Sequence, residues 1–252
     1  MVETANGERL LRRKCLAISA LVAAVCLLST EAAGDSPPDR RAIHALGDQY
    51  YPPITYLENG VPGGFDVDVL RALGEVMGRD VEIELMPWNL AQRQVQEGKA
   101  ETLTGLSITE ERKKSWDFAT PTLTRSFSLF VKSEEVTIHS VGDLRGKRVG
   151  VTAGGIPGEL LQGRPGLNLV VVANYEEGFD LLKRGGVDAI AADTWVAGYT
   201  LNKHRIEGIA LAGKPFATLD SAIAVPKGHQ ALLQEIDQGL EKLRQRGTIE
   251  NI

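Results

Sequence analysis

The chain of 252 residues carries 28 lysine and arginine residues against 33 aspartate and glutamate residues, which gives a formal net charge of −5 at pH 7. This length suits one large domain or two small ones, and the moderately hydrophobic composition with both charge signs excludes a disordered chain or a fibre. No basic stripe occurs outside the N-terminus, so nucleic acid is not an expected partner and a small ligand is the default expectation.

The first 33 residues have the pattern of a cleavable signal peptide. Basic residues precede the apolar run 15–28, and small residues follow it. Because the run is too short to span a bilayer comfortably, we expect cleavage near the alanine pair that follows it and no permanent anchor. Both cysteines, Cys15 and Cys26, lie in this segment, so the mature protein is expected to contain neither a thiol nor a disulfide.

The first strand is expected over residues 44–48, and it runs into the turn Tyr51-Pro52-Pro53. Sheets of α/β proteins hold their ligands in loops at strand ends, so Asp48 and Tyr51 are candidate ligand-binding residues. A Tyr-Pro-Pro turn also serves as a rigid corner with no binding role. The residues alone leave both interpretations open.

A helix is predicted over 66–77, where apolar residues recur on one face and Gly78 ends the pattern. An alternating strand follows over 81–85, and Asn89 is expected to cap the next helix. Trp88 stands between that strand and that helix. It either forms an apolar wall for a ligand or covers the core.

The stretch 105–112 follows an apolar strand and contains a glycine, two hydroxyl side chains and an arginine. A backbone N–H, the Ser107 hydroxyl and the Arg112 guanidinium would together hold a carboxylate, because the guanidinium fork pairs two oxygens in one plane. The alternative is that the Thr-Glu-Glu-Arg turn simply begins a helix on a solvated surface.

The second half of the chain repeats the order of strand, turn and helix. The strand 148–152 leads into the glycine turn 153–155, and the helix 157–162 has proline in its first turn. Unpaired N–H groups at such a helix start attract anions. The turn is not a phosphate-binding loop, because the lysine and hydroxyl that follow the second glycine of a Walker motif are absent.

Two buried strands are expected over 167–172 and 187–192, with a helix over 176–184 between them. The second strand ends at Asp193, and a carboxylate at a strand end beside a tryptophan suits a cation. Asp193 also suits the N-cap of a helix that starts at Thr194, and the two roles are compatible.

A strand over 221–225 and an amphipathic helix over 229–246 complete the pattern. Alternating strands and helices of this length predict an α/β fold with mostly parallel sheets. Two such runs, divided near 122–126 and rejoined near 217–221, indicate two lobes.

Seven segments occur in the order seen in the family-3 periplasmic solute-binding proteins, and nearly the whole mature chain resembles that family. The segments are Tyr51-Pro52-Pro53, Gly64-Phe65-Asp66-Val67-Asp68, Ser107 to Arg112, Asp117 to Pro121, Leu144 to Val151, Gly186-Val187-Asp188-Ala189 and Arg246-Gly247-Thr248. The resemblance implies the type II fold of periplasmic binding proteins, in which two hinge strands join two α/β lobes around a ligand cleft. It places lobe 1 at 42–121 plus 222–252, lobe 2 at 127–216, and the hinge segments at 122–126 and 217–221.

In amino-acid-binding members of that family, the arginine of the Ser-to-Arg motif pairs with the ligand α-carboxylate. The resemblance gives this role to Arg112, with help from Ser107 and from N–H groups of the glycine turn. Asp193 would hold the α-ammonium group, and the remaining residues near the first strand would face the side chain. The ligand-binding residues implied in this way are Asp48, Tyr51, Trp88, Gly105, Ser107, Arg112, Gly155, Ile156 and Asp193.

The chain departs from the family pattern in the glycine turn, where Gly155 replaces a common threonine, and after Pro121, where Thr122-Leu123 replaces an aromatic pair. These features resemble periplasmic domains fused to sensor kinases or diguanylate cyclases. We expect a monomeric periplasmic protein that captures a carboxylate-bearing ligand, a polar or basic amino acid, and hands it to an ABC permease. The alternative is a ligand-sensing input module for a membrane signalling protein.

An enzyme is the third interpretation, since a periplasmic cyclohexadienyl dehydratase uses the same fold. Its cleft carboxylate acts as an acid, a role that Asp193 or Asp48 would take here. The segment 105–109 lacks the final glycine of a nucleophile elbow, and the four histidines lack the spacing of metal ligands. We therefore expect no catalysis, no metal and no cofactor.

Overall fold

The structure is a computed structural model that describes residues 41–252. The predicted signal peptide, with Cys15 and Cys26, lies outside the described residues. Within 41–252, no helix combines the length and the apolar character that a membrane crossing requires.

The largest element is a mixed sheet with the strand order β10-β9-β11-β8-β12-β6-β1-β5, and β7 pairs with β12 beside this path. Strands β1, β5 and β6 are parallel to one another, as are β9, β10 and β11, whereas β8 and β12 run antiparallel to their neighbours. The strands are β1 (Ile43–Asp48), β5 (Val81–Met86), β6 (Thr102–Ser107), β7 (Trp116–Phe118), β8 (Leu123–Lys132), β9 (Arg148–Thr152), β10 (Asn168–Val172), β11 (Ala189–Asp193) and β12 (Ile209–Pro226).

A second, antiparallel sheet of three short strands lies between β1 and the first helix. It is formed by β2 (Tyr50–Tyr51), β3 (Thr55–Glu58) and β4 (Val61–Gly63). The Tyr51-Pro52-Pro53 turn connects β2 to β3, so this turn is a corner of the small sheet as well as the exit from β1.

The helices fall close to their predicted positions. They are α2 (Phe65–Met77), α3 (Trp88–Gln96), α4 (Ile156–Leu161), α5 (Tyr175–Lys183), α6 (Thr194–Lys203), α7 (Gln230–Gln245) and α8 (Thr248–Asn251), with short 3-10 helices η1 (Arg112–Lys114) and η2 (Val141–Leu144). Gly78 ends α2 in the left-handed conformation, as expected. The prediction that Asn89 caps α3 was wrong, because Pro87 holds the N-cap position and Asn89 lies inside the helix.

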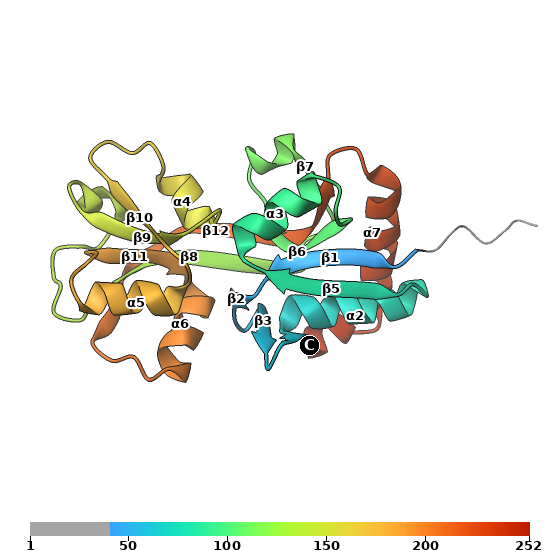
Figure 1. Ribbon diagram of the computed structural model, residues 1–252, viewed down its shortest axis with the longest axis horizontal. Helices are drawn as coiled ribbons and strands as arrows, with labels where there is room; N and C mark the ends of the chain where they lie inside the picture. Colours follow the sequence, from blue (N-terminus) through green and yellow to red (C-terminus); the bar gives the residue numbers. More distant parts are fainter. Residues whose placement is uncertain (1–40) are drawn as a thin grey trace, which may run out of the picture. The chain divides into compact units, whose positions relative to one another are not determined.

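Two groups of strands and helices form two lobes, and β8 and β12 belong to both (Figure 1). β12 pairs with β8 along most of its length and with β6 near its end. The two segments predicted as hinges lie opposite each other in this ladder, with Ser126 against Thr218 and Arg125 against Leu219. The α/β fold with two lobes follows the prediction; the residue boundaries of the lobes stay a proposal.

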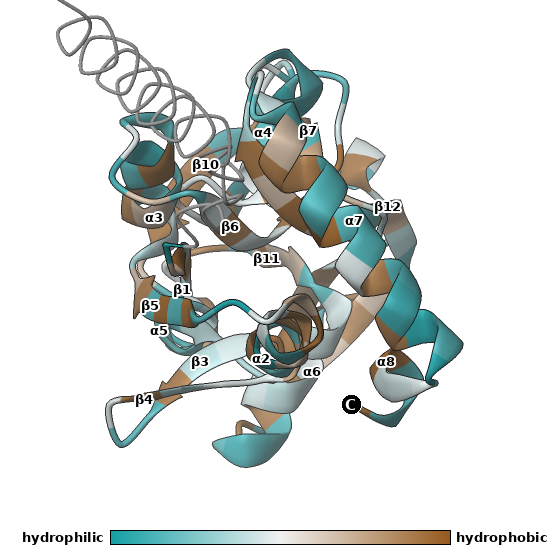
Figure 2. Ribbon diagram, turned by 90° about the vertical axis from the view of Figure 1, so that its right-hand side faces the viewer, coloured by the Kyte–Doolittle hydropathy of each residue, from teal (hydrophilic) through white to brown (hydrophobic). Residues whose placement is uncertain are grey.

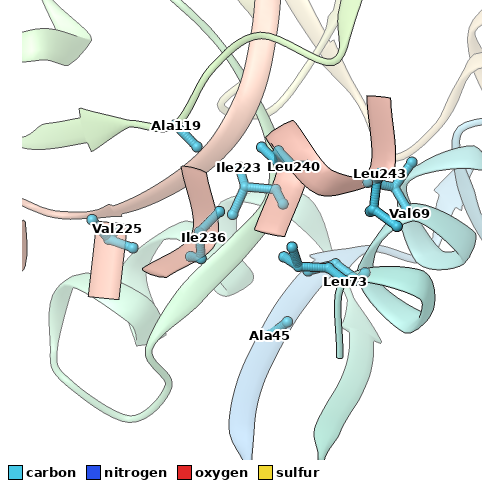
Figure 3. Close-up of a cluster of buried hydrophobic side chains, with 10 residues drawn as sticks. Ala45, Val69, Leu73, Ala119, Ile223, Val225, Ile236, Leu240 and Leu243 are labelled. Atoms are coloured by element: carbon cyan, nitrogen blue, oxygen red, sulfur yellow. The ribbon is translucent and has the colours of Figure 1, made fainter. Parts of the chain in front are cut away.

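In the first lobe, α2 and α7 cover one face of the sheet. Leu73 from α2 and Leu240 and Leu243 from α7 meet β1 and β12 in one apolar cluster, which Figure 3 shows. The helix α7 carries hydrophilic and hydrophobic segments side by side (Figure 2), and its apolar residues are the ones in this cluster. Burial of such side chains stabilises the fold by about 1.5–3 kcal/mol each.

The strand β10 was predicted to be buried, and this was wrong. It pairs only with β9, at the edge of the sheet, and Val171 is 67% exposed. A short apolar run does not distinguish an edge strand from a central one, because both have the same composition.

The packing of α7 on α2 generates a stability prediction. A Cβ added at Gly239 would overlap the buried Leu73 side chain and press on Met77, so Gly239→Ala is expected to lower the free energy of unfolding by about 1–3 kcal/mol. Gly198 in α6 has open space at the same position, so Gly198→Ala is expected to leave stability equal or up to about 1 kcal/mol higher. Urea unfolding of both variants checks the pair, and equal stability would contradict the close packing.

Candidate functional site

A small cavity of about 40 Å³ lies where the carboxyl ends of β1 and β6 meet β8 and the turn before α4. Eight of the nine predicted ligand-binding residues line it, namely Asp48, Tyr51, Trp88, Gly105, Ser107, Arg112, Gly155 and Ile156. Asp193 does not. Three lining residues that the sequence did not predict, Asp66, Arg125 and Tyr175, add two charges and a phenol to the wall.

Arg112 is 7% exposed and reaches across the cavity. Its Nε and Nη2 both donate to Oε1 of Glu159 on α4, at 3.0 and 2.6 Å. Nη1 donates to the carbonyl of Ser107 at 3.1 Å, and this contact orients the guanidinium plane. Burial lowers the pKa of Arg112, although the Glu159 carboxylate opposes that shift. A carboxylate of the protein's own chain therefore occupies the guanidinium edge predicted to hold a ligand.

The turn from Thr109 to Arg112 explains how Arg112 becomes buried although its sequence motif is typical of a solvent-exposed turn. The Arg112 N–H donates to the Thr109 hydroxyl at 3.1 Å, and a single 3-10 turn follows. Lys113 and Lys114 point to solvent and pair with Glu110 and Glu111. The stretch therefore forms a short helical turn, as the alternative predicted, and that turn directs its arginine inward; ligand binding by Arg112 stays a prediction.

The carbonyl oxygen of Gly154 is a second contact between the two sides of the cavity. It accepts hydrogen bonds from Trp88 Nε1 at 3.1 Å, from Gln92 Nε2 at 3.2 Å and from Arg112 Nη2 at 3.2 Å. Gly154 has φ of +69°, and a Cβ there would lie 2.7 Å from Gln92 Nε2. Trp88 lines the cavity and packs against a buried core cluster, and its indole N–H also joins α3 to the glycine turn.

Asp66 and Arg125 form a buried ion pair at the floor of the cavity. Arg125 Nη2 donates to Asp66 Oδ2 at 3.0 Å, and the two residues are 8% and 4% exposed. Burial raises the pKa of Asp66 to about 6, although Arg125 lowers it. Burial would lower the pKa of Arg125, yet Asp66 and other neighbours raise it overall. A Cβ at Gly105 would collide with the Asp66 carboxylate, so the glycine leaves room for the pair.

The sequence contained one signal for Asp66 and none for Arg125. Asp66 belongs to a segment that carried the family resemblance, and it lies in the first turn of α2. Arg125 lies in a segment predicted only as a connection between lobes. The inward direction of its side chain depends on the register between β8 and β12, which periodicity does not supply.

Asp48 is a second carboxylate in the cavity wall. Its Oδ1 accepts a hydrogen bond from the N–H of Tyr50 at 2.9 Å. Burial raises its pKa to about 6, while the Tyr50 N–H and the charge of Arg125 lower it. The Asp48 side chain is therefore a hydrogen-bond acceptor that feels the positive charge of the buried Arg125.

Asp193 lies behind the cavity wall and is 2% exposed. Its Oδ1 caps α6 by accepting from the N–H groups of Trp195 and Val196, which is the capping alternative that the sequence left open. Its Oδ2 accepts from the Tyr51 hydroxyl at 2.9 Å, and its own N–H donates to the Tyr175 hydroxyl. Burial and the Asp193 charge raise the pKa of Tyr51, so the phenol stays protonated.

No group of three or more histidine, cysteine, aspartate or glutamate side chains within residues 41–252 is arranged to hold a metal ion. The two arginines that line the cavity are each bound to a carboxylate of the protein. Arg112 pairs with Glu159, and Arg125 pairs with Asp66.

Residues 43–252 match the family model of bacterial extracellular solute-binding proteins, family 3, and the chain belongs to that family. The two-lobed fold is accordingly the type II fold of periplasmic binding proteins, as the structural relatives confirm. Among sequence relatives, the probable amino-acid-binding protein YxeM of Bacillus subtilis is 28% identical, over 92% of this chain and 91% of YxeM.

Two solved structures are similar to this chain. A histidine kinase sensor domain that resembles periplasmic binding proteins has a TM-score of 0.81 and 30% identity, covering 84% of this chain and 95% of its own. An ancestral arginine-binding protein bound to arginine has a TM-score of 0.78 and 32% identity, covering 84% and 96%. The relatives thus include amino-acid-binding proteins and a sensor domain, as predicted from the sequence motifs.

The raised pKa of Asp48 predicts a pH dependence of stability. The folded-state pKa of about 6 exceeds the ordinary value of 3.8, so the folded protein binds more protons than the unfolded chain between these values. Ionisation of Asp48 therefore removes stability as pH rises through this window. Replacement by asparagine keeps an acceptor for the Tyr50 N–H and removes the charge.

We expect Asp48→Asn to gain stability relative to the wild type as pH rises from about 4 to about 7, by on the order of 1–3 kcal/mol. Urea unfolding of both proteins across this range measures the difference. A difference that does not change with pH would show that Asp48 has an ordinary pKa in the folded protein.

Proposed function

We propose that this protein captures a small carboxylate-bearing ligand, a polar or basic amino acid, between its two lobes. The observation that carries the proposal is the pairing of the Arg112 guanidinium with a carboxylate across the cavity, supplied here by Glu159. A guanidinium edge that holds one carboxylate has the geometry for another. The ligand α-carboxylate would take the place of Glu159 on Arg112.

Ser107 and the N–H groups at Gly155 and Ile156 would complete this carboxylate site, since all three residues line the same cavity as Arg112. For the α-ammonium group we propose Asp193. Its Oδ2 accepts the hydrogen bond of the Tyr51 hydroxyl, and Tyr51 lines the cavity. Rotation of the Tyr51 side chain would therefore expose Oδ2 to the ligand. Asp48 and Trp88 would then face the ligand side chain.

Entry of the ligand requires a change in the cavity. The cavity of about 40 Å³ has room for a few water molecules only, because each water molecule needs roughly 10–15 Å³ of such space. An amino acid therefore enters when Glu159 swings away and the lobes separate. A ligand that contacts both lobes then favours the closed arrangement through its higher affinity for it.

Delivery to an ABC permease in the membrane, after export to the periplasm, is the proposed role of the closed complex. Family membership and the amino-acid-binding relatives support it. The sensor-domain relative supports the alternative, in which closure signals to a kinase or a similar protein. The ancestral arginine-binding protein has been solved with arginine and with glutamine, which makes basic and polar amino acids the first ligands to test.

A thermal-shift screen over the twenty amino acids tests the proposal. A ligand that binds only the folded state raises the unfolding midpoint, and a concentration of 100 times Kd stabilises by about 2.7 kcal/mol. We expect at least one polar or basic amino acid to raise the midpoint, and Arg112→Ala to abolish the rise.

Arg71→Ala is the matched control for the Arg112 variant. Arg71 is a half-exposed arginine of α2 that pairs with Asp68 and does not line the cavity. The control is expected to keep the full ligand-induced shift. An undiminished shift in Arg112→Ala would overturn the carboxylate role of Arg112.

A further inference from the structure

The small sheet of β2, β3 and β4 is anchored to the first lobe. Backbone N–H groups of Phe65 and Asp66, at the start of α2, donate to the carbonyls of Pro53 and Ile54 at 3.1 and 3.0 Å. These hydrogen bonds join the turn between β2 and β3 to a helix of the first-lobe core. The small sheet therefore moves with the first lobe when the two lobes separate.

The side chains of the same turn pack on the second lobe. Ile54 is 3% exposed and belongs to the apolar cluster formed by residues of α5, β11 and α6, among them Phe179 and Ile190. The Tyr51 ring lies 6.2 Å, between centroids, from the Tyr175 ring of α5. The small sheet is thus joined to one lobe by backbone hydrogen bonds and to the other by side-chain packing, and opening of the lobes breaks only the packing.

Lys203 makes a contact between the lobes outside the cavity. It lies in the last turn of α6, and its Nζ is 5.7 Å from the centroid of the Tyr56 ring on β3 (Figure 1). Nζ is also 5.5 Å from the ring of Tyr199, on the same helix. An ammonium is attracted by the negative charge on the face of an aromatic ring. The Tyr199 contact persists when the lobes separate, whereas the Tyr56 contact exists only while they are closed.

A groove of about 210 Å³ surrounds the Lys203–Tyr56 contact. Its walls come from the small sheet on one side and from α6 and the start of α5 on the other, so the groove also spans the lobes. No residue lines both this groove and the ligand cavity. A ligand that replaces Glu159 on Arg112 therefore leaves the Lys203–Tyr56 contact in place.

We propose that the small sheet is a clasp that favours the closed arrangement of the lobes before any ligand binds. Ile54 supplies the apolar part of the clasp, and Lys203 with Tyr56 supplies the charged part at its outer edge. The clasp acts on the unliganded protein, and only its effect on ligand affinity rests on the proposed function. A ligand that binds the closed form gains affinity in proportion to the fraction of protein that is already closed.

Pulsed electron spin resonance between two spin labels, one on each side of the ligand cavity, measures the closed fraction. The labels are attached at Gln96→Cys on α3 and Gln162→Cys after α4, two exposed positions, with Cys15 and Cys26 replaced by serine. We expect the unliganded protein to show the short distance of the closed structure beside a longer one. Absence of the short distance would overturn the inference.

Lys203→Met nearly keeps the length of the side chain and removes its charge. We expect this variant to lower the ratio of closed to open protein about two- to fivefold, the factor that corresponds to an exposed cation–π contact. Lys183→Met is the matched control, because Lys183 is exposed in the last turn of α5 and does not line the groove. An unchanged ratio in Lys203→Met, or an equal change in both variants, would overturn the clasp.

A wild type that shows only the short distance calls for a stronger change. Ile54→Val removes one methylene from the apolar part of the clasp, and it is combined with Lys203→Met. We expect an open population to appear in this double variant. Its absence would contradict the clasp.

Tyr56→Leu assigns the effect to the contact between the two side chains. If Lys203 acts through the Tyr56 ring, the variant that combines Tyr56→Leu with Lys203→Met has the same closed-to-open ratio as either single variant. Effects that multiply would contradict a role for this contact. A merely structural role would lower the free energy of unfolding without changing the ratio, so urea unfolding of each variant separates the two.

Ligand titration distinguishes failure of the clasp from failure of the proposed function. For an amino acid that binds the wild type, Lys203→Met is expected to weaken binding by up to about fivefold, the largest change expected in the ratio. A changed ratio without binding of any amino acid would support the clasp and overturn the proposed function. Amino-acid binding with an unchanged ratio would overturn the clasp alone.

Discussion

The ion pair between Arg112 and Glu159 is the contact on which the arrangement of the cavity depends. It joins a turn after β6 to α4, and the Ser107 and Gly154 carbonyls hold the guanidinium in the orientation that makes the pair. Arg112 is almost fully buried, so removal of its partner without a replacement would leave a charge unpaired in a low-dielectric site. Glu159 supplies that partner, and under the proposed function a ligand carboxylate would replace it.

A second ion pair, between Asp66 and Arg125, lies at the floor of the cavity, so the positive and negative charges there also cancel. The Asp66–Arg125 pair spans from the start of α2 to β8, and Gly105 provides the space that it fills. Because Arg125 lies on β8, a strand shared by both lobes, this pair joins the start of α2 to the connection between the lobes.

The sequence predicted elements and strand-end residues well, because both depend on local pattern. Asp48 and Ser107 end parallel strands, and parallel strands bring their carboxyl ends to one edge of the sheet. It did not predict Glu159, which has the sequence context of an ordinary helix-surface acid, or Arg125, whose direction depends on strand register. Asp193 was predicted at the right strand end, yet its position behind Tyr51 follows from tertiary packing that one strand does not specify.

The competition between Glu159 and a ligand carboxylate is measured most directly by titrating the wild type and Glu159→Gln with the best amino acid from the thermal-shift screen. Glutamine at this position keeps the size of the side chain and removes its charge, so Arg112 would be easier to free. Because Glu159 is about one-third exposed, we expect the variant to bind about two- to fivefold more tightly. Weaker binding by the variant would contradict the account, since it would show that Glu159 holds the ligand instead of competing with it.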